Sequence, residues 1–163
     1  MSIKEYFQEW IVHYARAKDV IARKITNIEK NKFRSDVFIE YKDKKHIYFV
    51  EPFLKNTSDV LEKIRKSKKE AGEDSRSTLI VVNTLENLNV IVSSFDKLAE
   101  FDPHFSIIFV NPFSGLDTKW MIFPSTHSII GEKASLQRGL KSLFETVETT
   151  TEKEFEERLK KEK

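Results

Sequence analysis

Cysteine is absent from this 163-residue sequence, and glycine and proline are scarce, with four of each. The lack of thiols excludes disulfides, iron–sulfur clusters, thiolate zinc sites and cysteine nucleophiles, and it fits a cytoplasmic protein. The four glycines, at positions 72, 115, 131 and 139, build neither a phosphate-binding loop nor a dinucleotide fingerprint. No apolar run approaches the length of a membrane span, so we expect no membrane partner.

Histidine and serine also lack the spacing of common catalytic motifs. The histidines, His13, His46, His104 and His127, form no i,i+4 pair and no HExxH motif, which argues against a zinc enzyme. No serine stands in a GxSxG context, so the nucleophile elbow of a serine hydrolase is missing.

Charge is abundant but unevenly spread. Charged residues make up 33% of the chain, while the net charge is only +2. Residues 16–34 hold seven basic groups against two acidic ones, and residues 55–69 hold six against two. Such an asymmetry can focus a positive field on an anionic partner such as nucleic acid. A solvated lysine-rich face is the alternative, and the sequence leaves both open.

Hydrophobic periodicity predicts alternating helices and strands. Apolar residues at three- and four-residue spacing indicate helices over residues 3–21, 58–71, 85–101 and 133–147. Short alternating or continuous apolar runs indicate strands over residues 24–29, 36–41, 46–52, 78–83, 105–110 and 119–123. Strands joined through helices are expected to be parallel neighbours, and the hairpin at 36–52 is expected to be antiparallel. The predicted fold class is therefore α/β, with a mixed β-sheet flanked by helices.

Residues 1–147 are expected to form a single α/β domain, since this length is enough for one hydrophobic core. Residues 148–163 differ in composition, because only Phe155 and Leu159 are apolar. We interpret this segment as a charged helical tail, solvent-exposed or frayed, through which the chain docks a protein partner or a second copy.

Two acidic residues stand at the open end of the expected hairpin. Asp36 begins one strand and Glu51 ends the next, with a polar turn at 42–45 between the strands. Two carboxylates brought together can hold a divalent cation, because hard cations prefer several oxygen ligands. Alternatively, Asp36 is a turn residue that follows Ser35, and Glu51 is a solvated strand end.

This arrangement resembles the PD-(D/E)XK nuclease superfamily, whose restriction-endonuclease-like fold includes archaeal Holliday-junction resolvases. The order helix, three strands, helix, strand matches over residues 3–83, and the rest of the chain looks like an added C-terminal β/α extension. The resemblance implies that Asp36 and Glu51 are catalytic residues and ligands of Mg²⁺. The chain departs from the family at Phe53, which stands in Glu51-Pro52-Phe53 where the family has lysine.

The resemblance also implies where the missing ammonium group lies, and the basic segments indicate where nucleic acid would bind. In the family, the lysine orients the attacking water or stabilises charge on the reacting phosphate, and some members carry it on the following helix. Lys55, two residues beyond Phe53, and Lys63 or Lys66 on the following helix could supply the ammonium group, and Lys63 is the candidate catalytic lysine. The residues expected to contact nucleic acid are Lys55, Lys63, Lys66 and Arg34.

Three functions stay open. The first is a nucleic-acid-binding restriction-endonuclease-like domain with a degenerate, inactive or weakly active nuclease site and no required cofactor. The second is a divergent Mg²⁺-dependent nuclease that uses Asp36 and Glu51. The third is a protein-interaction module that works through the C-terminal helix or the loop at 111–118. The uneven basic charge favours the first two, and Phe53 favours the first over the second, so we lean toward a protein that is not an enzyme.

Overall fold

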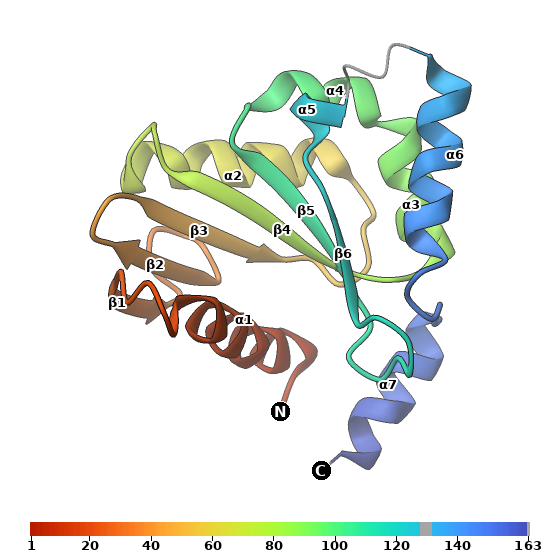
Figure 1. The fold of residues 1–163 in the computed structure, drawn as a ribbon, viewed down its shortest axis with the longest axis horizontal. Coiled ribbons are helices and arrows are strands. Elements are labelled where there is room, and N and C mark those ends of the chain that lie inside the picture. Colours follow the sequence, from red (N-terminus) through yellow and green to blue (C-terminus); the bar gives the residue numbers. More distant parts are fainter. Residues whose placement is uncertain (128–131, 163) are drawn as a thin grey trace.

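The computed structural model describes residues 1–127 and 132–162. Within these residues, a six-stranded mixed sheet forms the centre of the molecule (Figure 1). The strands lie side by side in sequence order: β1 (Ile25–Lys30), β2 (Val37–Tyr41), β3 (Lys45–Val50), β4 (Arg76–Val82), β5 (Phe105–Val110) and β6 (Lys119–Ile122). β3, β4 and β5 are parallel, and the other adjacent pairs are antiparallel. The predicted α/β class with a mixed sheet is confirmed.

Helices cover both faces of this sheet (Figure 1). They are α1 (Ile3–Asp19), α2 (Thr57–Ala71), α3 (Leu85–Ser93), α4 (Phe95–Phe101), α5 (Pro124–His127), α6 (Lys133–Phe144) and α7 (Glu152–Lys161). One hydrophobic core receives side chains from α2, α3, α4 and α6, and the other receives them from α1 and α7. We call the two sides of the sheet the α2 face and the α1 face. None of the helices in the described part of the chain is long and apolar enough to cross a membrane.

The central strands supply both cores at once. On β4, Leu79 and Val81 belong to the core of the α2 face, and Ile80 and Val82 belong to the core of the α1 face. This division follows from the two-residue period of a strand, whose successive side chains point to opposite sides. A strand buried on both sides needs a continuous apolar run, which is why TLIVV in the sequence predicts an interior strand.

The helix predicted over residues 85–101 is divided in two at Ser94. Ser94 has φ −106° and ψ 10°, and the hydroxyl of the preceding Ser93 donates to the carbonyl of Val90 at 3.0 Å. Serine hydroxyls compete with the backbone ladder of a helix, and adjacent small polar residues are common at sharp bends. The apolar periodicity continues across the bend, so the sequence pattern predicts one helix where the chain forms α3 and α4.

Helix α7 contradicts the expectation of an exposed or frayed tail. Phe155 is fully buried, and Leu159 is 7% exposed. The ring of Phe155 stacks on Phe7 of α1 with 5.7 Å between centroids, and it also contacts Phe53 and Phe113 from two loops. The two apolar side chains of this charged segment therefore complete the core of the α1 face and are not available to a partner.

Candidate functional site

The two predicted acids lie at the same end of an antiparallel strand pair. Asp36 immediately precedes β2, and Glu51 immediately follows β3. Val37 pairs with Tyr48 across these strands, and the backbone N–H of Asp36 donates to the carbonyl of Tyr48 at 2.9 Å. The short connection between β2 and β3 fixes this register, so the backbone positions of the two acids lie at the same end of the hairpin, opposite the turn.

Asp36 is buried and has a partner for each carboxylate oxygen. Its side chain is 3% exposed. Its Oδ2 accepts a hydrogen bond of 2.6 Å from the backbone N–H of Val50, and its Oδ1 lies 2.9 Å from Nζ of Lys4 on α1. The first contact continues the β2–β3 ladder beyond the end of β2, and the second balances the negative charge. A carboxylate in this position needs both kinds of contact, because burying an unpaired charge is costly.

Gln8, one turn after Lys4 on α1, also binds Asp36. Its Nε2 donates to the carbonyl of Asp36 and to Oδ1 of Asn31, each at 2.9 Å. A capping box between Ser2 and Glu5 fixes the first turn of α1, which carries Lys4. Lys4 and Gln8 were not predicted as partners of Asp36. Their four-residue spacing puts them on one helix face, but nothing in the sequence identifies that face as the one that meets Asp36.

Glu51 turns toward the other side of the sheet. Its Oε1 lies 3.8 Å from Nζ of Lys63 on α2, and both side chains are 35% exposed. At that distance the contact is an ion pair in contact with solvent, not a short hydrogen bond. The candidate lysine of α2 therefore does lie beside the second acid, whereas the first acid is paired with a lysine of α1.

The segment after Glu51 is a packed loop. Phe53, at the position of the family lysine, packs on the core of the α1 face with its centroid 6.3 Å from that of Phe155. Asn87, which is buried in α3, holds the backbone on both sides of Phe53. Its Nδ2 donates to the carbonyl of Pro52 at 2.8 Å, and its Oδ1 accepts from the N–H of Leu54 at 2.8 Å. These bonds hold the backbone on both sides of Phe53, whose partly buried ring packs against the core of the α1 face.

Many cations of the two basic segments have acidic partners. The pairs are Lys24–Asp43, Lys30–Glu9, Lys32–Glu29, Arg34–Glu70, Arg65–Glu62 and Lys68–Asp102. Of the residues predicted to contact nucleic acid, Arg34 is thus partly neutralised. Lys55 and Lys66 are exposed and form no ion pair within the described part of the chain.

The contacts of Asp36 and Glu51 do not provide the open set of oxygen ligands that Mg²⁺ requires. Each oxygen of Asp36 already has a donor, and Glu51 is paired with Lys63. Among residues 1–127 and 132–162, no group of three or more histidine and carboxylate side chains is arranged to hold a metal ion.

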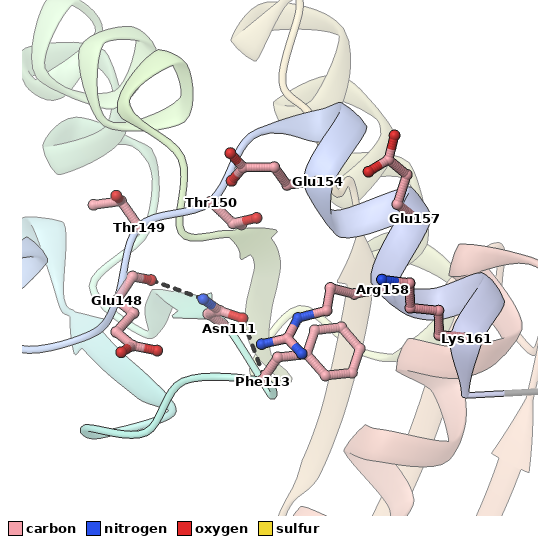
Figure 2. A pocket seen from close by; sticks show the side chains of 9 residues that line it. All are labelled: Asn111, Phe113, Glu148, Thr149, Thr150, Glu154, Glu157, Arg158 and Lys161. Atoms are coloured by element: carbon pink, nitrogen blue, oxygen red, sulfur yellow. Dashed lines mark hydrogen bonds between the residues drawn. The ribbon is translucent and has the colours of Figure 1, made fainter.

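A separate pocket of about 270 Å³ lies between the loop after β5 and helix α7 (Figure 2). Figure 2 shows Asn111 bonded to two neighbours in this pocket: it donates to the carbonyl of Glu148 at 2.9 Å and accepts from the N–H of Phe113 at 3.1 Å. The guanidinium of Arg158 lies 5.6 Å from the ring centroid of Phe113. Acidic and basic side chains line the pocket together, so its charge favours no class of ligand.

Comparison with protein-family models, with curated proteins and with solved structures finds no match for this chain. The resemblance to the PD-(D/E)XK superfamily therefore stays a prediction from the sequence.

Proposed function

We propose that this chain is a nucleic-acid-binding domain with a restriction-endonuclease-like core and a nuclease site that has lost its metal. The ion pair between Lys4 and Asp36 carries the proposal. The ammonium group supplies at this carboxylate the positive charge that a divalent cation supplies in a metal-dependent nuclease. Phe53 supports it further, because the position that the family gives to a catalytic lysine here holds a partly buried ring that packs against the core of the α1 face.

The surface beside this site supports binding to phosphates. Lys55 lies in the loop that follows Glu51, and Lys66 lies one helical turn beyond Lys63 on α2. Both are exposed. Cations that have no acidic partner are free to contact phosphate groups, and such contacts give affinity without dependence on sequence. The order α1, β1, β2, β3, α2, β4 is also the order that the resemblance implies.

A divergent nuclease is the second candidate, and one contact favours it. Lys63 lies 3.8 Å from Glu51, where a relocated catalytic lysine is expected. A metal bound at this site would compete with the ammonium of Lys4 for the carboxylate of Asp36.

A cleavage assay paired with a binding assay separates the two candidates. Wild type, Phe53→Lys, Asp36→Ala and Lys63→Ala are incubated with Mg²⁺ or Mn²⁺ on plasmid, single-stranded DNA, branched DNA and RNA, and binding is followed by fluorescence anisotropy without metal. We expect wild type to bind without metal and to cleave no faster than Asp36→Ala. Cleavage by wild type that both Asp36→Ala and Lys63→Ala abolish would establish the nuclease. A chain that neither binds nor cleaves would refute both candidates.

A further inference from the structure

A cavity of about 340 Å³ opens on the α1 face of the sheet, away from Asp36 and Glu51. It lies at the amino ends of β3, β4 and β5, whereas Glu51 follows the carboxyl end of β3. The last turns of α1 form one wall, and Met121 of β6 with Phe123 forms another.

The floor of this cavity is a polar row on a face that is otherwise apolar. His46, Thr78 and Ser106 lie on β3, β4 and β5, each two residues before a residue of the α1-face core. Nε2 of His46 lies 2.7 Å from Oγ1 of Thr78, which lies 2.8 Å from Oγ of Ser106. Thr78 and Ser106 are buried. Apolar side chains would fill these positions without the cost of burying hydroxyl groups, so the row is not explained by packing alone.

Three cations surround the opening without an acidic partner. Lys18, Lys44 and Arg76 are exposed, and none forms an ion pair with any of the described residues. The ammonium of Lys44 lies 5.0 Å from the ring centroid of Tyr41, and that of Lys18 lies 3.4 Å from the hydroxyl of Tyr14. The aromatic rings keep these flexible side chains at the rim, where their charges act on the cavity.

The acid in the wall does not cancel these charges. Asp19 is the one acidic residue among the described residues that line the cavity. Both of its oxygens accept backbone N–H groups, from Lys24 at 2.8 Å and from Ile25 at 2.9 Å. Its role is to close the turn between α1 and β1, and the cavity keeps a net positive charge.

Burial and the nearby positive charges both lower the pKa of His46. Burial, and then the charges of Lys44, Arg76 and Lys18, lower the pKa of His46 from 6.5 to about 3. The ring is therefore neutral at ordinary pH and carries one N–H. When Nε2 carries it, His46 donates to Thr78, Thr78 donates to Ser106, and the Ser106 hydroxyl is left to donate into the cavity.

We propose that this cavity binds the phosphate group of a phosphate monoester, with Arg76 and Lys44 as charge partners and Ser106 as a neutral donor. Guanidinium and ammonium groups are the usual protein partners of phosphate, and the guanidinium matches two phosphate oxygens at once. The volume is at the lower end of the range of small-molecule sites, about 300–1,000 Å³, so one nucleotide-sized group fits. The site does not depend on the nucleic-acid surface proposed along α2, because it lies on the other face and at the other strand ends.

A titration followed by nuclear magnetic resonance tests the site in the full chain. The ring signals of His46 are observed while AMP, inorganic phosphate or adenosine is added. We expect AMP and phosphate to shift these signals and adenosine to leave them unchanged. Arg76→Gln and Lys44→Gln should each weaken the binding of AMP about tenfold, the effect of removing one charged hydrogen-bond partner. Lys153→Gln, an exposed change on α7, should leave it unchanged.

A terminally phosphorylated dinucleotide and its hydroxyl-terminated counterpart distinguish two sources of the group. If the phosphorylated dinucleotide binds more tightly than AMP, and its hydroxyl-terminated counterpart does not, the site recognises the phosphorylated end of a nucleic-acid chain. If AMP binds more tightly, the site recognises a free phosphate monoester. The proposal is overturned if no phosphate-bearing probe shifts the His46 signals at millimolar concentration, or if Arg76→Gln and Lys44→Gln bind AMP as tightly as wild type.

Discussion

The ammonium group of Lys4 lies 2.9 Å from Oδ1 of Asp36, whose other oxygen accepts the backbone N–H of Val50. Through these contacts, one buried carboxylate connects the first turn of α1 to the open end of the β2–β3 hairpin. The same residue is the one that the sequence resemblance predicts to be the first acid of a nuclease motif. In the structure, this carboxylate joins two elements of the fold.

The stability of variants at this position tests the structural role of Asp36. Asp36→Ala should lower the free energy of unfolding by about 2 kcal/mol, because the buried N–H of Val50 loses its acceptor. Lys4→Ala should cost about 1–2 kcal/mol, because it leaves the buried carboxylate of Asp36 without its cation, although half of the Lys4 side chain is exposed and its charge is partly screened. Urea denaturation measures both, with Lys153→Ala as the exposed control. An Asp36→Ala variant at least as stable as wild type would instead indicate a carboxylate kept for chemistry.

Removal of the Phe155 ring tests whether α7 is part of the fold. Phe155→Ala should lower the free energy of unfolding by about 3–5 kcal/mol, since it deletes a fully buried ring that contacts three others. Lys153→Ala on the outer side of the same helix should change it little. If thermal unfolding of Phe155→Ala matches wild type, α7 is an exposed tail after all.

His46 should make the protein less stable in mild acid. Its pKa is about 3 in the folded chain and 6.5 ordinarily, so between these values the unfolded chain binds a proton that the folded chain does not. The stabilisation is fully present above pH 6.5 and falls as the pH is lowered, by up to about 1.4 kcal/mol per pH unit. His46→Gln, which keeps a polar partner for Thr78, should remove this part of the slope. Urea denaturation from about pH 7 to pH 4 measures the difference between the two slopes. Equal slopes would show that His46 titrates normally in the folded chain.

The sequence predicted the sheet well because its signals are local. Continuous apolar runs mark β4 and β5, and the connecting helices make them parallel neighbours. The placement of Asp36 and Glu51 at the same end of the hairpin was also predictable, because a short turn fixes the register of a hairpin. The expected convergence of their carboxylates is not found, since Asp36 pairs with Lys4 of α1 and Glu51 with Lys63 of α2 on the other side of the sheet.

The partners of these acids were not predictable from the sequence. Lys4 reaches Asp36 from α1 and Lys63 reaches Glu51 from α2, and both contacts depend on how a helix is placed on the sheet. The burial of α7 was not predicted from the sequence, for a related reason. Two apolar residues in a charged segment give a weak periodic signal, and only the ring of Phe7 beside them shows that they complete a core.

The salt dependence of nucleic-acid binding without metal tests the proposed function most directly. Anisotropy of a labelled oligonucleotide is measured over a series of salt concentrations in the presence of a chelator. The logarithm of the binding constant should fall linearly with the logarithm of the salt concentration, because phosphate contacts release counterions. The double variant Lys55→Ala/Lys66→Ala should reduce the slope by about 2, one for each lost contact, while Lys153→Ala keeps the slope of wild type. A flat salt response, or binding that appears only when Mg²⁺ is added, would contradict the account.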